Sequence, residues 1–302
     1  MHPLDGVIVP LVTALDDAGR PDAAGSQRFL DVLAEAGVHT LMLLGSNGEG
    51  ALLPPDATRG YLREVVERWR AARPDGAVVV NVSAPGAAEM QRRTELALEA
   101  DPDVVMTSPP GYFRHRPDEI EAHIRALAAF GHPFAIYNIP AYMNPLPPEV
   151  FEALLDEPRL VGIKDSSGDL EMLTRFVELA SVRGDVVVAQ GDEARLVHGL
   201  RAGARGIVPG LANIAPATSV RLYAAAAGGD ERTAKEAQAV LTSLIGIHAI
   251  RRGVPTVKGI LHDRGLLPSA RCAAPLASVT AEELARLREF LAPFEAELVG
   301  ER

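Results

Sequence analysis

The sequence predicts an α/β protein, a (β/α)8 TIM barrel with a C-terminal helical extension. Eight short apolar runs rich in Val and Ile recur along the chain up to Val208, and amphipathic segments of helical period separate them. Most of the runs are continuous rather than alternating, which is typical of strands buried on both faces. Strands that alternate with helices favour parallel pairing with right-handed crossovers, and a barrel is the simplest closed arrangement.

The expected strands follow one another at regular intervals. They are Gly6–Val12, Thr40–Leu44, Ala77–Val82, Asp103–Met106, Pro133–Tyr137, Leu160–Lys164, Asp185–Ala189 and Gly206–Val208. A doubly wound open sheet is the alternative, but the glycine fingerprint that usually accompanies it is absent from the sequence.

The expected helices between the strands carry apolar residues on one side and Arg and Glu on the other. They are Asp56–Ala72, Ala87–Ala100, Pro117–Phe130, Pro148–Leu155, Leu170–Val182 and Glu193–Ala202. Several begin with proline and an acidic residue, which favours the first turn of a helix.

Beyond about residue 225 the pattern is helical only, over Glu231–Ile250, Val254–Arg264 and Ala281–Leu298. We therefore expect residues 1–225 to form the barrel with the active site and residues 226–302 to form a C-terminal helical region.

The composition excludes several classes of protein. The 302 residues carry 40 acidic and 30 basic side chains, a net charge of −10, which argues against binding to nucleic acid or to an anionic membrane surface. No apolar stretch is long enough to span a membrane, and the first residues do not resemble a signal peptide. Cys272 is the only cysteine, so the cytoplasm is the expected compartment.

Lysine is scarce. Only three of the 30 basic residues are lysine, Lys164, Lys235 and Lys258, and codon use in a GC-rich genome accounts for the general shortage. Lys164 closes the apolar run of the sixth strand, where the active site of a barrel lies. It is either a strand-end lysine that reaches solvent or a buried amine nucleophile, which arginine cannot replace.

Other candidates lie at the same ends of the strands. Gly45-Ser46-Asn47-Gly48-Glu49-Gly50 follows the second strand and is either a plain turn or a cradle of backbone N–H groups for an anion. Tyr137 ends the fifth strand, where it is either an ordinary core residue with its hydroxyl at the rim or a group that relays protons. Gly191-Asp192-Glu193 follows the seventh strand, and a helix cap with its acids on the helix dipole is favoured over a functional role. The eight histidines show no metal-binding spacing, so no metal site is expected.

Three motifs in order resemble the dihydrodipicolinate synthase / N-acetylneuraminate lyase family of class I pyruvate-dependent aldolases: Gly45-Ser46-Asn47-Gly48-Glu49, Tyr137-Asn138-Ile139-Pro140 and Gly162-Ile163-Lys164-Asp165. The resemblance runs from Gly6 to the Val257-Lys258-Gly259 segment. It implies Schiff-base chemistry on pyruvate or another 2-oxo acid, without a metal or organic cofactor, in a homotetramer built as a dimer of dimers.

The resemblance also implies roles for individual residues. Lys164 matches the Schiff-base lysine, Tyr137 the proton-shuttling tyrosine and Ser46 the relay hydroxyl. Asn47, with Gly48 beside it, matches the group that holds the 2-oxo acid carboxylate. Further matches are Tyr112, a tyrosine lent to the neighbouring subunit's site; Val208, whose backbone lines the pyruvate pocket; and Gly191, Asp192 and Glu193, near positions that bind substrate hydroxyls.

One position departs from the family pattern. Where dihydrodipicolinate synthases typically have an arginine that grips the second substrate's carboxylate, this chain has Tyr142. A tyrosine offers at most one hydrogen bond where arginine offers a bidentate clamp. The leading hypothesis is therefore a lyase that joins pyruvate to an aldehyde or cleaves a 2-oxo-3-deoxy sugar acid or 4-hydroxy-2-oxo acid. Dihydrodipicolinate synthase, a deoxy sugar acid dehydratase and a non-catalytic 2-oxo acid sensor are the alternatives.

Overall fold

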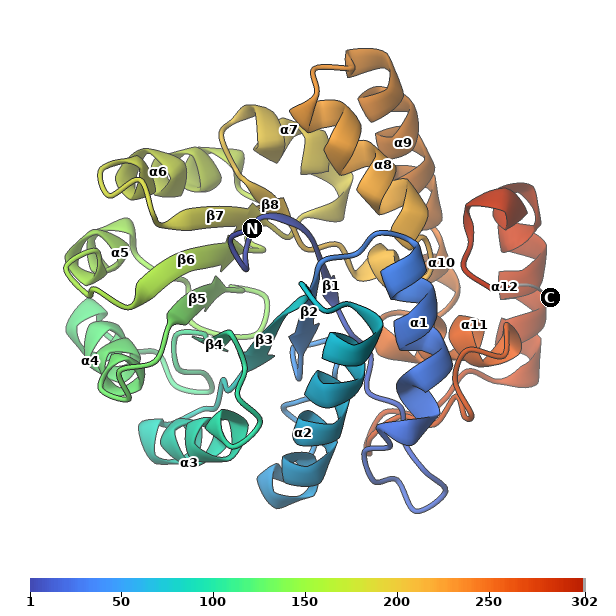
Figure 1. Cartoon of the computed structure of the whole chain (residues 1–302), viewed down its shortest axis with the longest axis horizontal. Helices are drawn as coiled ribbons and strands as arrows, with labels where there is room; N and C mark the ends of the chain where they lie inside the picture. The colour runs from blue at the N-terminus through green and yellow to red at the C-terminus, as the bar shows by residue number, and fades with distance from the viewer. Residues whose placement is uncertain (301–302) are drawn as a thin grey trace.

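The computed structural model describes residues 1–300 and shows a closed barrel of parallel strands in sequential order (Figure 1). The strands are β1 (Gly6–Pro10), β2 (Thr40–Leu43), β3 (Ala77–Asn81), β4 (Val104–Thr107), β5 (Phe134–Asn138), β6 (Leu160–Asp165), β7 (Val187–Gln190) and β8 (Gly206–Ile207). The barrel closes where β1 pairs with β8, with Gly6 opposite Gly206. Each predicted strand is present within two residues of its expected ends, and the predicted fold class is confirmed.

Helices cover the outside of the barrel. They are α1 (Gln27–Glu35), α2 (Pro55–Ala72), α3 (Ala87–Leu98), α4 (Pro117–Ala128), α5 (Pro148–Leu154), α6 (Leu170–Ser181), α7 (Leu196–Arg201) and α8 (Pro216–Ala227). The expected start signals are used. Proline occupies the first helical turn of α2, α4 and α5, and Asp169 caps α6 by accepting hydrogen bonds from two backbone N–H groups.

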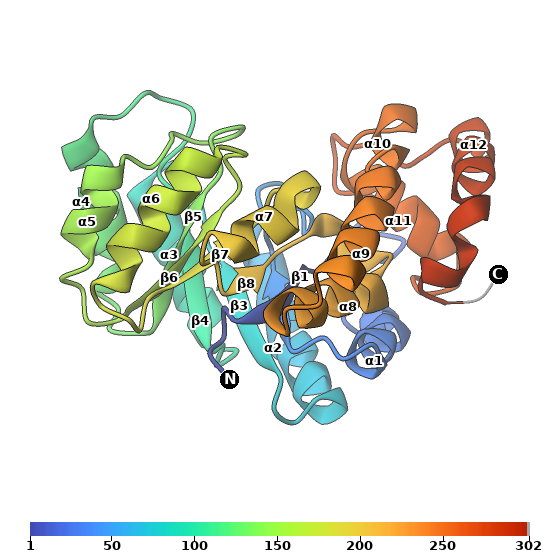
Figure 2. The same ribbon diagram turned by 90° about the horizontal axis from the view of Figure 1, so that it is seen from above.

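Four further helices follow the barrel: α9 (Glu231–Leu244), α10 (Ile247–Ile250), α11 (Val254–Asp263) and α12 (Ala281–Leu291). Figures 1 and 2 place them together on one side of the barrel, beside α1 and α8. None of the helices within residues 1–300 combines the length and the apolar character that crossing a membrane requires. The division of the chain into two domains at residue 225 stays a prediction, and the last barrel helix ends at Ala227.

Some helical predictions need correction. No helix is predicted between the first two strands, yet α1 lies there and buries Phe29, Leu30 and Leu33. The expected helix Glu231–Ile250 is interrupted at Gly246, between α9 and α10. Helix α12 gives way to a 3-10 helix, Ala292–Glu297, that contains Pro293 near its start, because proline cannot donate the backbone hydrogen bond that an α-helix needs.

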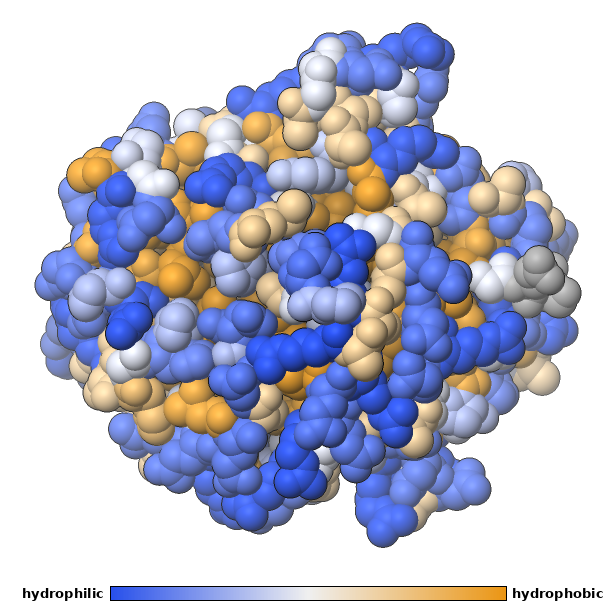
Figure 3. Space-filling view, in the orientation of Figure 1, coloured by the Kyte–Doolittle hydropathy of each residue, from blue (hydrophilic) through white to orange (hydrophobic). Residues whose placement is uncertain are grey.

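Two apolar clusters hold the barrel together. The larger one lies between strands and helices, and the smaller one fills the barrel interior. The inner cluster consists of Leu4, Ile8, Met42, Val79, Val104, Met106, Ala135, Tyr137, Ile139, Val187, Ala189 and Val208. Two predicted site residues, Tyr137 and Val208, are therefore part of the packed interior. The face of the molecule shown in Figure 3 is mostly hydrophilic, with hydrophobic residues in small groups between charged ones, as on an ordinary solvated surface.

Candidate active site

Lys164 lies one residue before the end of β6 and is buried, with 4% of its surface exposed. In the barrel register it is opposite Tyr137 of β5 and Ala189 of β7. Its Nζ lies 3.9 Å from the centroid of the Tyr137 ring and 3.6 Å from Sδ of Met42. The amine therefore points into the barrel at the carboxyl end of the strands, as a nucleophile would and a solvated surface charge would not.

Tyr137 carries its hydroxyl into the same space. Burial acts to raise the pKa of Tyr137. The adjacent Lys164 ammonium and hydrogen bonds with Ser46 and Ser166 outweigh burial, so that the pKa of the phenol is lowered. A phenol that gives up its proton more easily is a better acid–base group near neutral pH.

The loop after β2 brings Ser46 to Tyr137, and its backbone has an unusual shape. Leu44 and Glu49 both have left-handed φ angles, 55° and 56°, which are uncommon for residues with side chains. Gly48 lies between them. A Cβ at Gly48 would come within 2.8 Å of the Leu44 nitrogen and 3.0 Å of the Leu11 carbonyl oxygen. Gly48 is thus required for close approach of the backbone.

Asn47 faces the loop after β8. A Cβ at Gly210 would lie 3.0 Å from Asn47 Nδ2 and 3.3 Å from Glu193 Oε1. The end of β2 and the ends of β7 and β8 therefore meet around Gly210. Val208 precedes this loop, is buried, and donates its backbone N–H to the Gln190 carbonyl at 2.8 Å.

The two acids after β7 behave differently. Asp192 accepts a hydrogen bond from the Ala194 backbone N–H at 3.1 Å, which is the capping role that the sequence favours. Glu193 instead reaches the β8 loop, where Oε1 accepts from the Leu211 N–H at 2.6 Å. Burial raises the pKa of Glu193. Gly191 lies just before them, and its N–H donates to the Asp165 carbonyl at 2.7 Å.

Tyr112 and Tyr142 lie on the surface. Tyr112 is 90% exposed, has a φ of 68°, and packs edge-on against Phe113 with 4.8 Å between ring centroids. Tyr142 is 68% exposed. Within one chain both rings face solvent rather than Lys164.

Two features of the site are not among the residues predicted from the sequence. Ser166, two residues after Lys164, hydrogen-bonds to Tyr137, and its position at a strand end could have marked it. Asn138 and Asp165 tie β5 to β6, because Asn138 Nδ2 donates to Asp165 Oδ1 at 2.7 Å. Burial raises the pKa of Asp165. This pair holds the two strands that carry Tyr137 and Lys164.

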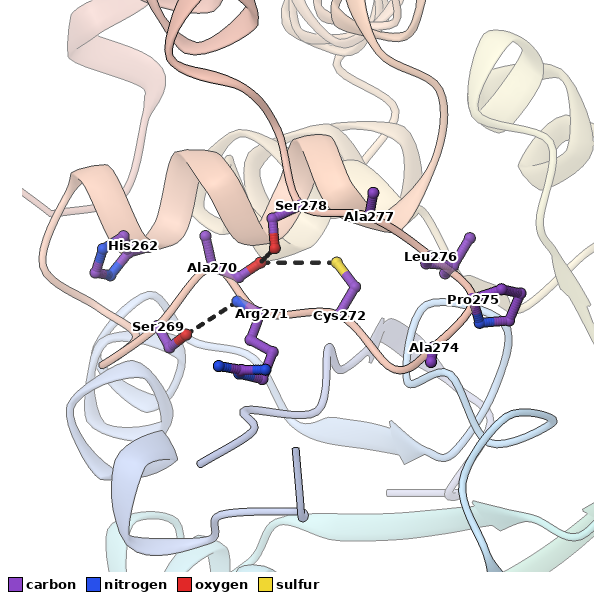
Figure 4. Close-up of a pocket in the computed structure, with 10 residues that line it drawn as sticks. All are labelled: His262, Ser269, Ala270, Arg271, Cys272, Ala274, Pro275, Leu276, Ala277 and Ser278. Carbon is purple, nitrogen blue, oxygen red and sulfur yellow. Dashed lines mark hydrogen bonds between the residues drawn. The ribbon is translucent and has the colours of Figure 1, made fainter. Parts of the chain in front are cut away.

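A separate depression of about 560 Å³ lies along the loop that joins α11 to α12 (Figure 4). Its lining comes from His262 and from the loop segments Ser269–Cys272 and Ala274–Ser278, where Ser278 Oγ and Cys272 Sγ both donate to the Ala270 carbonyl. None of the predicted site residues lines it. Within residues 1–300, no group of three or more His, Cys, Asp or Glu side chains is arranged to hold a metal ion.

The chain is similar to known proteins over most of its length. Residues 3–293 match the model of the dihydrodipicolinate synthetase family. A 4-hydroxy-tetrahydrodipicolinate synthase of Pseudomonas aeruginosa is 30% identical, over 90% of this chain and 95% of that protein. An uncharacterised DapA-like lyase of Halobacterium salinarum is 31% identical, over 87% and 84%.

Among solved structures, the dihydrodipicolinate synthase of Bacteroides thetaiotaomicron superimposes with a TM-score of 0.89 at 26% identity, over 97% of this chain and 99% of that one. The shared fold, the extent of the match and the inward-facing lysine lead to one conclusion. The chain belongs to the dihydrodipicolinate synthetase family and is a lyase of the class I aldolase type.

Proposed function

We propose that Lys164 forms a Schiff base with pyruvate or the pyruvyl end of a longer 2-oxo acid, and that the enzyme makes or breaks the C3–C4 bond of a 2-oxo-3-deoxy sugar acid or 4-hydroxy-2-oxo acid. The observation that carries this proposal is the burial of the Lys164 amine against the Tyr137 ring, 3.9 Å from its centroid. A buried amine attacks carbonyl carbon efficiently because it is desolvated.

The chemistry follows from the positions of these groups. The Lys164 nitrogen attacks C2, water leaves, and the iminium that forms withdraws electrons from C3. In the cleavage direction Tyr137 takes the proton of the C4 hydroxyl, so that the C3–C4 bond breaks and an aldehyde leaves. The enamine then takes a proton at C3, and water releases pyruvate from Lys164. Every step uses side chains of the protein, so we propose that no metal or organic cofactor takes part.

The loops around Gly210 are the proposed binding site for the rest of the substrate. Asn47 and the backbone beside Gly48 would hold the 2-oxo acid carboxylate, and the backbone at Val208 would line the pyruvyl pocket. Asp192 and Glu193, with Gly191, would face a polyol tail, although Glu193 already accepts the Leu211 N–H.

Synthesis of 4-hydroxy-tetrahydrodipicolinate is the second candidate, because the Pseudomonas aeruginosa relative carries that name at 30% identity. Tyr142 argues against it: a phenol that is 68% exposed replaces the bidentate arginine clamp that a carboxylate-bearing aldehyde would need. Dehydration of a deoxy sugar acid would use the same Schiff base, and identification of the reaction product distinguishes it from cleavage of the C3–C4 bond.

A second copy of the chain is part of the proposal. We infer that Tyr112, 90% exposed beside the exposed Phe113, enters a neighbouring subunit's site in a homotetramer built as a dimer of dimers. The single cysteine, Cys272, supports a cytoplasmic location for this assembly.

Borohydride reduction in the presence of pyruvate tests the proposal. We expect a mass increase that maps to Lys164 in the wild-type chain, and no increase in Lys164→Arg, which keeps the positive charge but cannot form the adduct. Absence of an adduct in the wild type would contradict the proposal and favour a non-catalytic sensor. A panel of aldehydes offered with pyruvate then identifies the product, and efficient turnover of aspartate semialdehyde would favour the second candidate.

A further inference from the structure

Beneath the loop that carries Ser46 and Asn47 lies a fully buried ion pair. Glu49 of this loop pairs with Lys258 of α11, and neither side chain has any exposed surface. Glu49 Oε1 also accepts the Ala273 backbone N–H at 2.7 Å, and Lys258 Nζ donates to the Arg271 carbonyl at 2.9 Å. The C-terminal helical region therefore contacts the predicted active-site loop directly.

Two buried neighbours of the pair, Tyr61 and Cys272, resist ionisation. Burial raises the pKa of Tyr61 to about 12 and that of Cys272 to about 11, and Glu49 adds to both shifts. Both neighbours are therefore neutral at neutral pH. Since burying two charges is costly and an apolar pair often stabilises a fold equally well, stability alone does not account for this arrangement.

The loop itself needs an external constraint. Leu44 and Glu49 bracket Ser46 and Asn47, and both hold left-handed φ angles, which persist only where the surroundings over-determine them. From the barrel, Thr13 Oγ1 donates a hydrogen bond to the Gly48 carbonyl at 2.7 Å, and Asn81 Nδ2 donates one to the Leu44 carbonyl. The contact that fixes Glu49 itself comes from Lys258 and Ala273, more than 200 residues away in the sequence.

We propose that Glu49 and Lys258 are positioning residues for the reaction: together they hold the loop in the shape that brings Ser46 to Tyr137 and Asn47 to Gly210. This inference rests on the proposed function, because it assigns the loop's shape to the transfer of protons by Tyr137. It also makes residues beyond the barrel necessary for activity, although they contribute no catalytic residue.

The exchange of pyruvate methyl protons for deuterium, followed by NMR, tests this without knowledge of the aldehyde. The iminium on Lys164 loses a C3 proton to Tyr137 and regains a deuteron, so the rate reports on Schiff-base turnover and proton transfer, and the borohydride adduct measures Schiff-base formation separately. In Glu49→Gln and Lys258→Met we expect the exchange rate to fall at least tenfold at saturating pyruvate and the KM for pyruvate to rise. The rising limb of the pH–rate profile should move to higher pH, because Tyr137 loses its hydrogen bond with Ser46.

The double variant Glu49→Gln/Lys258→Met protects the test against simple misfolding, since it leaves no unpaired buried charge. Its exchange rate should fall by the same factor as in the single variants. Arg264→Met is the matched control: Arg264 is a cation of the same helical region, 3% exposed, and it binds the Gly300 carbonyl and Glu295 rather than the loop. It should lower the melting temperature and leave the exchange rate and pH profile unchanged.

The outcomes are distinguishable. An unchanged exchange rate and pH profile in the double variant would overturn the positioning role while leaving the Schiff base intact. Loss of the borohydride adduct at saturating pyruvate in the double variant would also overturn it, because the damage would then extend to β6. Failure of the wild type to form an adduct would instead count against the proposed function itself.

Discussion

In Gly191→Ala we expect the added methyl group to displace Ser166, which hydrogen-bonds to Tyr137, and thereby to slow proton transfer. A Cβ at Gly191 would lie 2.1 Å from Ser166 Oγ and 3.1 Å from the Asp165 carbonyl oxygen. Non-bonded heavy atoms settle at about 3.5 Å or more, so the Ser166 hydroxyl has to move by more than about 1 Å. It then loses its hydrogen bond with Tyr137, one of the interactions that lower the pKa of that phenol.

The size of the effect follows from the nature of this hydrogen bond. A hydrogen bond to a charged group contributes about 1.5–3 kcal/mol, which corresponds to a fall of about 10- to 100-fold in the rate of pyruvate methyl exchange. The borohydride adduct on Lys164 should still form, because the methyl group is directed at Ser166 rather than at β6.

A double-mutant cycle distinguishes this mechanism from general damage. Ser166→Ala removes the same hydroxyl directly, and Gly191→Ala/Ser166→Ala should be no slower than Ser166→Ala alone, because the displaced group is already gone. If the two single effects multiply in the double variant, or if Gly191→Ala exchanges at the wild-type rate, the steric reasoning is wrong.

Three further predictions concern the same site. Tyr137→Phe should reduce methyl exchange by about 10²- to 10⁴-fold, as expected for a lost acid–base group, while mass spectrometry still finds the adduct; a loss below threefold would refute the role of the hydroxyl. Tyr142→Arg should lower the KM for an aldehyde that bears a carboxylate by at least about tenfold, since a charge-assisted hydrogen bond contributes about 1.5–3 kcal/mol. The KM for a neutral aldehyde should be unchanged. Burial raises the pKa of Glu193 from 4.5, so the folded state binds the carboxyl proton more strongly than the unfolded state does. The protonated carboxyl therefore stabilises the fold at low pH, and this stabilisation is lost as the pH rises through the raised pKa. Urea denaturation should therefore show Glu193→Gln gaining stability over the wild type from pH 4 to pH 7, and a constant difference would contradict the assignment.

The strands could be predicted because the physical requirement on each is local. A parallel strand in a barrel is buried on both faces, so runs such as Ala77–Val82 are visible without knowledge of their neighbours. Helix α1 shows the opposite case. Its apolar residues Phe29, Leu30 and Leu33 are buried, but no side chain caps its start. The segment therefore lacks the helix start signals that are present in α4 and α6.

The candidate site divides in the same way. Lys164 could be predicted because it closes an apolar strand in a lysine-poor chain, whereas the strand end alone leaves Tyr137 open between a core residue and a proton relay. Closure of the barrel places the two residues opposite each other. The rings of Tyr112 and Tyr142 are exposed in the chain, so the roles assigned to them stay predictions.

The scarcity of lysine in this chain marks Lys258 as well as Lys164. In a chain where arginine supplies nearly all surface cations, the retained lysines should be those that arginine cannot replace. Lys235 does not fit, since its side chain is 68% exposed and pairs with Glu231. Lys258 does fit: it is completely buried, and its single Nζ serves both Glu49 and the Arg271 carbonyl, where the larger planar guanidinium would need more room and more acceptors. The same reasoning that selects Lys164 from composition therefore selects Lys258. What the sequence cannot supply is its partner, because Glu49 lies more than 200 residues away and only the fold brings the two together.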